Sequence, residues 1–237
     1  MQNEDNLMLI DELKGQFSPE ELAEVLDSYK ELMIKYSCAI KEVRTKFEVL
    51  NEELSIKNQR NPIHAIYSRI KTIQSIRSKL TRKNLEFSLD NIQDEIHDVA
   101  GIRVVCPFVD DIYEIADMIL KQDDIKLINY KDYIRAPKAN GYRSYHMIIE
   151  IPVFFSEHKE YLKVEVQLRT IAMDFWASLE HEMRYKKDLT EEMSQAIGAQ
   201  LLDCATTITE MDSKMQDIKN QIYPKYQDIP VLQNNYY

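Results

Sequence analysis

The chain has 237 residues, of which 44% are apolar and 30% are charged. This length and composition indicate one globular core with helical additions, and no apolar stretch reaches the roughly 20 residues of a membrane helix. The net charge of −10 argues against general nucleic-acid binding. The polar, acidic first residues lack the features of a secretory signal, so we expect a cytoplasmic protein. Three scattered cysteines without a C-x-x-C pair predict reduced thiols and no zinc site.

Charge is distributed unevenly along the chain. Between Glu53 and Glu86 lie 32 residues without a single Asp or Glu, and they carry eight Lys and Arg residues. In an acidic protein, such a segment indicates a local site for polyanions, above all phosphates. A solvated helix face would produce the same composition, so charge alone leaves both interpretations open.

The first predicted element is a long helix. Ser18-Pro19-Glu20-Glu21 has the pattern of a capping box with proline at the first helical position, and apolar residues continue at helical spacing to about residue 50. A polar linker is expected over 51–61, followed by a short strand over 63–71. A helix over 72–83 would then place Ser75, Lys79 and Arg82 on one face.

The following elements suggest an α+β fold with a mixed sheet. A strand is predicted over 98–106, a helix over 109–121 and a second strand over 125–134. Two further strands, over 144–153 and 161–169, flank a polar turn as in a hairpin. Helices are expected over 170–185, with Phe175, Trp176, Leu179 and Met183 as the apolar side, and over 189–222. The order β-α-β-α-β-β-β-α predicts one mixed domain over about 60–187, between helical extensions and a loosely ordered tail.

Glycine-rich phosphate loops are not predicted, because the chain contains only four glycines. Phosphates would therefore have to be bound by side chains. Two glycines lie in short polar signatures, D-V-A-G-I-R over 98–103 and P-K-A-N-G-Y-R-S-Y-H over 137–146. Glycine at such places usually permits a turn or a close backbone approach.

The strand over 161–169 alternates strictly between apolar and polar residues. Its apolar residues would face the core, and the opposite face would carry Lys163, Glu165, Gln167 and Arg169. An ordinary exposed strand would show the same polar face. Asp98 and Glu165 beside a cationic helix would nevertheless suit magnesium and a nucleotide, since carboxylates bind the cation and Lys or Arg bind phosphates.

Five segments in combination, residues 98–103, 132–134, 137–146, 165–170 and 175–181, resemble the synthetase domain of the RelA/SpoT family. The pattern N-G-Y-x-S-x-H followed by E-x-Q-x-R-T is most similar to the short, single-domain members, the small alarmone synthetases. The resemblance covers about residues 61–187. It implies a nucleotidyltransferase-like mixed β-sheet flanked by helices, with an N-terminal extension over 1–60 and a C-terminal helix and tail over 188–237.

The resemblance also implies an activity and a site. The activity is Mg²⁺-dependent transfer of pyrophosphate from ATP to the 3′-hydroxyl of GDP or GTP, which makes (p)ppGpp in the stringent response and releases AMP. The family's ATP site matches Arg69, Lys71, Ser75, Lys79, Arg82 and Arg103. Its metal and catalytic carboxylates match Asp98 and Glu165, of which Glu165 would also activate the acceptor hydroxyl. Its guanine-nucleotide site matches Lys138, Tyr142, His146, Gln167 and, less directly, Asp174.

Several alternatives remain at this stage. His97-Asp98 resembles the mark of the family's hydrolase domain, but the other histidines show no matching pattern, so we expect no hydrolase activity. A non-enzymatic helical interaction protein would leave the acid-free segment and the glycine signatures unexplained. The acceptor could instead be an adenine nucleotide or the 3′ end of tRNA, although overall acidity disfavours tRNA. The family favours homotetramers, yet the terminal helices could equally pack against their own chain. Residues 51–60 look longer than the family's usual connection, so the sequence does not decide whether the chain has inherited a regulatory pocket.

Overall fold

The computed structural model describes residues 18–58, 60–184 and 190–223. The elements follow the order α2 (Pro19–Asn58), β1 (Ala65–Ile70), α3 (Ile73–Arg82), α4 (Leu89–Glu95), β2 (Ala100–Cys106), α5 (Val109–Leu120), β3 (Lys126–Asp132), β4 (Tyr145–Phe154), β5 (Lys159–Thr170), α6 (Ile171–Arg184) and α7 (Glu191–Ile222). This order confirms the predicted α+β fold, apart from α4, which was not expected. Within the described ranges no helix could span a lipid bilayer.

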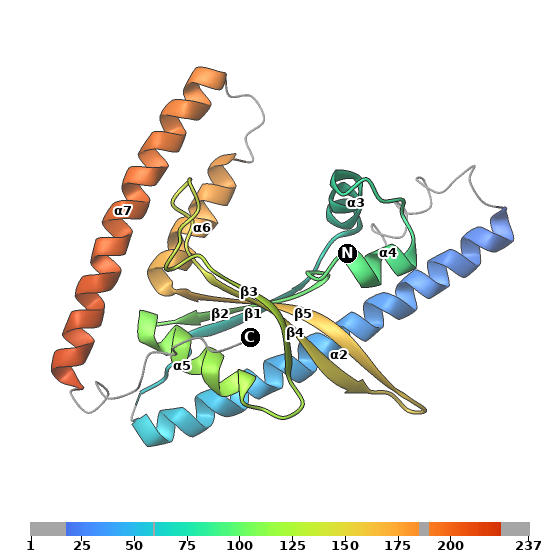
Figure 1. Ribbon diagram of the computed structural model, residues 1–237, viewed down its shortest axis with the longest axis horizontal. Helices are drawn as coiled ribbons and strands as arrows, with labels where there is room; N and C mark the ends of the chain where they lie inside the picture. The colour runs from blue at the N-terminus through green and yellow to red at the C-terminus, as the bar shows by residue number, and fades with distance from the viewer. Residues whose placement is uncertain (1–17, 59, 185–189, 224–237) are drawn as a thin grey trace.

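A five-stranded mixed sheet lies at the centre of the fold, with strand order β1-β2-β5-β4-β3 (Figure 1). The pair β2 and β5 is parallel, and the other neighbours are antiparallel. The apolar residues of β5 are buried as predicted, on the face that packs against α2 and α5. The opposite face of the sheet is polar and lies between α3 and α4 on one side and α6 on the other (Figure 1).

The helix α2 runs beneath the sheet and is longer than expected. Its buried residues Tyr36, Val43 and Phe47 belong to the main hydrophobic core. The prediction of a linker over 51–61 was wrong for residues up to Asn58, because Leu54 continues the buried stripe of the helix. Asn51, in the last turns of this helix, also holds the chain that follows, since its Oδ1 accepts a hydrogen bond from the backbone N–H of Ile63 at 3.1 Å.

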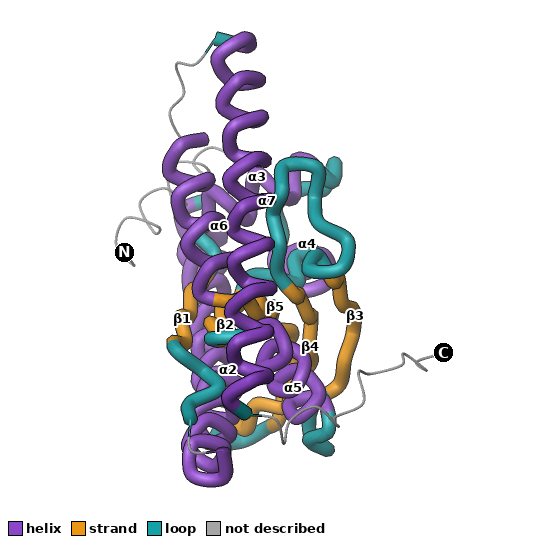
Figure 2. The backbone as a smooth tube through the Cα atoms, turned by 90° about the vertical axis from the view of Figure 1, so that its left-hand side faces the viewer, coloured by secondary structure: helices purple, strands orange, loops and turns teal. Residues whose placement is uncertain are grey.

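The helices α6 and α7 run side by side at one end of the sheet (Figure 2). The predicted apolar side of α6 was partly wrong: Trp176 is buried, but Phe175, Leu179 and Met183 are exposed. The buried side is formed by Met173, Trp176 and Ala177, and the Trp176 indole N–H donates to the carbonyl of Leu201 on α7 at 2.9 Å. The docking of α7 selects this side, and helical periodicity alone does not contain that information. The predicted ends at residues 185 and 189 and the tail beyond 223 lie outside the described residues.

A buried ionic cluster joins distant parts of the chain around Asp111, in the first turn of α5. Asp111 is fully buried and accepts two hydrogen bonds from the Arg60 guanidinium, at 2.9 and 2.5 Å. Lys219 of α7, whose side chain is 1% exposed, donates to the same carboxylate at 3.3 Å. The cluster therefore ties the segment before β1, the start of α5 and the end of α7 together.

We predict that Asp111→Asn destabilises the protein by about 3–5 kcal/mol, because Arg60 and Lys219 would lose the buried carboxylate that they share, and Lys219 would keep the more distant Asp110, at 3.8 Å. Urea unfolding followed by circular dichroism measures the change. Asp117→Asn on the same helix is the control, since Asp117 pairs with the exposed Lys121 and such pairs contribute about 1 kcal/mol or less. Equal losses in the two variants would contradict the role given to the cluster.

Candidate functional site

The strand register gathers most of the predicted site residues on the polar face of the sheet. Residues directly opposite each other on neighbouring strands share a face. The pairs on this face include Tyr67 with Arg103, Arg69 with Gly101, Gly101 with Glu165, Arg103 with Gln167, and Gln167 with His146. Residues up to 64 positions apart in the sequence thus meet on one surface.

Several pockets hollow this face, and two neighbouring ones share a residue. One, of about 460 Å³, is lined by side chains that include Arg69, Arg103, Tyr142, Gln167 and Arg169. The other, of about 340 Å³, is lined by side chains that include Lys79, Lys83, Asp98, Lys138 and His146. Glu165 lines both pockets. Two ligands that filled these pockets would therefore meet at the Glu165 carboxylate.

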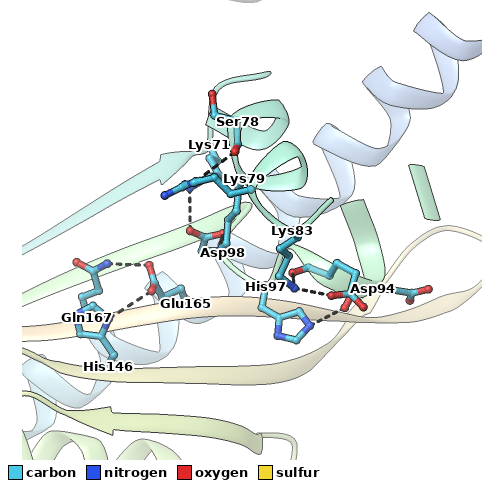
Figure 3. A network of polar contacts seen from close by, with 12 residues as sticks. Lys71, Ser78, Lys79, Lys83, Asp94, His97, Asp98, His146, Glu165 and Gln167 are labelled. Atoms are coloured by element: carbon cyan, nitrogen blue, oxygen red, sulfur yellow. Dashed lines mark hydrogen bonds and ion pairs between the residues drawn. The ribbon is translucent and has the colours of Figure 1, made fainter. Parts of the chain in front are cut away.

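The first acidic group of the site is Asp98, which lies just before β2. Its two carboxylate oxygens accept hydrogen bonds from Lys71 and from Lys79, each at 2.8 Å (Figure 3). Burial alone would raise the pKa of Asp98, but the two ammonium groups outweigh burial, and the pKa lies below its usual value. The acid-free segment therefore has an acidic partner after all, because Asp98 lies outside the segment in sequence but against it in space.

The second acidic group is Glu165 at the centre of the face (Figure 3). The imidazole Nδ1 of His146 lies 3.4 Å from its Oε1, and the Gln167 amide donates to its Oε2 at 2.8 Å. Burial raises the pKa of Glu165, but the interactions with His146 and Gln167 outweigh burial and lower it overall. Both Asp98 and Glu165 are therefore ionised near neutral pH.

Two ionised carboxylates beside lysines fit a hard divalent cation that also contacts phosphate. Among the described residues, no group of three or more His, Cys, Asp or Glu side chains is placed to hold a metal alone. Mg²⁺ is usually held by one or two carboxylates together with substrate phosphates and water. The donor set formed by Asp98 and Glu165 matches that pattern and does not match a permanent structural metal centre.

The structure brings four of the six predicted ATP residues to the site. Lys71 and Lys79 contact Asp98, and Arg69 and Arg103 extend from β1 and β2 into the larger pocket. The Arg103 guanidinium lies over the Tyr67 ring, 4.9 Å from its centroid. The other two predicted residues, Ser75 and Arg82, lie on the exposed surface of α3, outside both pockets.

All five predicted acceptor residues lie near one another around the Tyr142 ring. The Tyr142 hydroxyl is 2.8 Å from His146 Nε2, and the Lys138 ammonium lies 4.7 Å from the ring centroid. Asp174 is held 3.1 Å from Arg169 and 3.3 Å from Arg103. Tyr142 lines the pocket that contains Arg69 and Arg103, and it also lines a further pocket of about 430 Å³ together with Lys138, His146 and Gln167. Tyr142 therefore lies at the boundary between the predicted donor and acceptor residues.

Sequence reasoning assigned no role to two residues at the site, Arg169 and Tyr133. Arg169 is 7% exposed and contacts Tyr142, Gln167 and Asp174. The Tyr133 ring packs edge-on against His146, with centroids 5.3 Å apart. The pattern E-x-Q-x-R-T contained a signal for Arg169, and the family-like segment 132–134 contained one for Tyr133, but only the fold shows that Tyr133 lies against His146.

The glycine of the second signature holds the acceptor loop against α7. Gly141 has φ +87°, a conformation that side chains other than glycine rarely adopt. A Cβ atom added at Gly141 would lie 2.5 Å from the Cβ of Ala205 on α7. The loop that carries Tyr142 is therefore backed directly by the C-terminal helix.

We predict that Gly141→Ala destabilises the loop by at least about 1–2 kcal/mol, the cost of the left-handed conformation. The contact with Ala205 adds to this cost, so Ala205→Gly should restore only part of the loss. Thermal unfolding measures the effect. The control is Gly198→Ala in α7, where a Cβ meets nothing within 4 Å and should stabilise the helix by up to about 1 kcal/mol. A neutral Gly141→Ala variant would contradict this account of the loop.

Comparisons with known proteins show which family and which solved structures the chain resembles. Residues 68–190 match the family described as the region found in RelA / SpoT proteins. The GTP pyrophosphokinase YwaC of Bacillus subtilis is 39% identical over 203 residues, which cover 86% of this chain and 96% of that protein. The crystal structure of the small alarmone synthetase 2 from Bacillus subtilis has a TM-score of 0.72 and 40% identity, and the match covers 82% of this chain and 99% of that one.

A second structural relative was solved with nucleotides bound. The small alarmone synthetase 1 from Bacillus subtilis, bound to its product pppGpp, has a TM-score of 0.74 and 28% identity, with 83% of this chain and 98% of that chain covered. The same protein bound to AMPCPP has a TM-score of 0.69 and 26% identity, with 84% and 99% covered.

Proposed function

This chain belongs to the family of RelA and SpoT proteins, and we propose that it is a (p)ppGpp synthetase that transfers pyrophosphate from ATP to the 3′-hydroxyl of GDP or GTP. The observation that carries the proposal is the position of Glu165, whose carboxylate lines both pockets of the polar face. The names of the relatives support the same activity. Under this proposal, the acid-free segment binds phosphates and the glycine signatures shape the site, whereas a helical interaction protein would leave both features unexplained.

In the proposed reaction, the acceptor 3′-oxygen bonds to the β-phosphorus of ATP and the bond from that phosphorus to the α-phosphate oxygen breaks. AMP leaves with this oxygen, and the acceptor hydroxyl proton passes to the Glu165 carboxylate. Such a transfer requires mainly alignment of the attacking oxygen and neutralisation of phosphate charge. The interactions with His146 and Gln167 keep Glu165 ionised, so that its carboxylate carries no proton when the acceptor binds, and the same lowering of its pKa makes it a weaker base.

Asp98 and Glu165 would hold Mg²⁺, which when bound neutralises charge on the transferred phosphates. The lysines of the site already face this position. Lys71 and Lys79 contact Asp98 in the structure, and we propose that they also bind the ATP phosphates. Arg69 and Arg103 would flank the adenine from β1 and β2. Ser75 and Arg82 would contact ATP only at the exposed end of α3, so their assignment depends on the family resemblance more than on the pockets.

On the acceptor side, we propose that the guanine base stacks on Tyr142. Lys138 would bind the acceptor phosphates beside His146, whose two ring nitrogens already face Tyr142 and Glu165, and Gln167 would support the sugar. Asp174 would face the guanine edge, although in the structure its carboxylate is already paired with Arg169 and Arg103.

We also propose that the chain acts in the cytoplasm as a homotetramer, with residues 61–187 as the synthetase domain. Exposed apolar residues at helical spacing on α7 support an assembly, namely Met211, Met215, Ile218 and Ile222. The proposed location, assembly and domain bounds otherwise rest on the family and on composition. Size-exclusion chromatography with light scattering tests the assembly directly.

We predict that Glu165→Gln lowers turnover about 100-fold or more, because the amide keeps the size of the side chain but removes its charge. The assay is chromatography of labelled ATP with GDP, GTP or ADP as acceptor, which also tests whether the acceptor is a guanine nucleotide. Glu150→Gln is the matched control, since Glu150 lies on β4 outside both pockets and contacts Lys126. Near-normal turnover in folded Glu165→Gln would refute the role of Glu165.

A separate prediction concerns the ATP phosphates. Lys79→Ala should weaken ATP binding by roughly 1.5–3 kcal/mol, the contribution of a charge-assisted hydrogen bond. Arg82→Ala should do the same only if the triphosphate extends along α3 beyond the pocket. The KM for ATP and titration with a non-hydrolysable analogue measure both effects, with Lys57→Ala on α2 as the control. Unchanged ATP kinetics in both variants would mean that this basic face is merely solvated.

A further inference from the structure

Arg169 contacts three of the proposed acceptor residues at once, although it has no place in the reaction described above. Its Nη2 donates to the Tyr142 hydroxyl and to Gln167 Oε1, both at 2.7 Å, and its Nη1 donates to Asp174 Oδ1 at 3.1 Å. The side chain is 8% exposed. A buried guanidinium with three such partners fixes their positions, because arginine presents its donors in a rigid planar fork.

The first hydrogen-bond chain from Arg169 runs through Gln167. Arginine can only donate, so the Gln167 amide must turn its oxygen toward Arg169. Its nitrogen is thereby directed at Glu165 Oε2, to which it donates at 2.8 Å. The orientation of the amide, and with it one hydrogen bond to Glu165, is set by Arg169.

The second chain runs through Tyr142 and His146. Because the Tyr142 oxygen accepts from Arg169, its own proton is free to be donated to His146 Nε2, at 2.8 Å. In a neutral imidazole that accepts at Nε2, the proton resides on Nδ1. Nδ1 lies 3.4 Å from Glu165 Oε1, so the second chain ends on the other oxygen of the same carboxylate.

We infer that Arg169 is a positioning residue that sets the donor direction of two hydrogen-bond chains, which end on the two oxygens of Glu165. The inference rests on the proposed role of Glu165. With both chains in place, the carboxylate has a donor at each oxygen and a fixed orientation between the two pockets. Arg169 therefore acts through Glu165 without contacting the reacting atoms.

The kinetic test is a double-mutant cycle of Arg169→Lys and Glu165→Gln. Lysine keeps the positive charge beside Asp174 but lacks the two donor nitrogens of the fork. We expect Arg169→Lys to lower kcat about 10- to 100-fold, the usual effect of losing an outer partner of a site ligand. In the Glu165→Gln background the same change should have little further effect, because the group through which Arg169 acts is already altered. An equal factor in both backgrounds, or full activity of Arg169→Lys, would overturn the inference.

A spectroscopic test does not depend on activity. Side-chain ¹⁵N NMR recorded over a pH series should show that the neutral form of the His146 imidazole carries its proton on Nδ1. The His146→Gln variant identifies the signal among the five histidines. Arg169→Lys should shift this signal toward the other tautomer, and an unchanged tautomer would overturn the second chain.

Failure of the inference can be distinguished from failure of the proposed role of Glu165. Full activity of Glu165→Gln would refute that role, whereas an inactive Glu165→Gln with an equal Arg169→Lys factor in both backgrounds would refute only the inference. Should Arg169→Lys not fold, Tyr142→Phe combined with Gln167→Met replaces it. That variant removes the first partner in each hydrogen-bond chain and leaves Arg169 paired with Asp174. We again expect a fall in kcat in the wild-type background and little further fall in the Glu165→Gln background.

Discussion

The two-sided sheet is the constraint on which the rest of the structure depends. Along β5, Val164 and Val166 point into the core while Glu165 and Gln167 point to the open face. A shift of one residue in the register of β5 would bury the polar row and expose the apolar one. The packing of α2 and α5 on the apolar face therefore also fixes which residues face the two pockets. Stability and the position of the site are determined by the same alternation.

The charges of the open face are largely satisfied by one another. Lys71 and Lys79 neutralise Asp98, and Arg169 with Arg103 neutralises Asp174. Buried charges without partners would be costly, so these pairs stabilise the site before any nucleotide arrives. An incoming polyphosphate and its cation must replace some of these partners. The phosphates and their cation would then take the place of ion-pair partners that are already present on this face, so few additional charges would have to be buried.

Much of the fold could be predicted because it is encoded locally. The alternation of β5 and the proline-initiated capping box each carry their own signal. The course of α2 beyond residue 50 could not be predicted, since polar residues there surround the single buried Leu54. Neither could the buried side of α6, because the position of α7 determines it.

Within the site, the residue types were predictable and their contacts were not. The motifs identified Asp98, Glu165, Tyr142 and His146. The pairing of β4 with β5 brings His146 to Glu165, and the loop before β4 places Tyr142 against His146. The pairing of Lys79 with Asp98 crosses from α3 to the start of β2, and the contacts of Arg169 involve Tyr142, 27 positions away. Such contacts are set by the tertiary arrangement and leave no periodic trace in the sequence.

The position of α7 has a consequence for how the protein matures on the ribosome. The sheet and the helices that cover its apolar face are complete in the chain before α7 is synthesised. The loop at Gly141 gains its support, and Thr170 its partner Asp212, only when α7 docks. The nascent chain can therefore hold a formed hydrophobic core while the wall of its nucleotide pocket is still unfinished. The wall of the pocket at this loop is therefore completed only after α7 has been synthesised, some 60 residues after the loop that it supports.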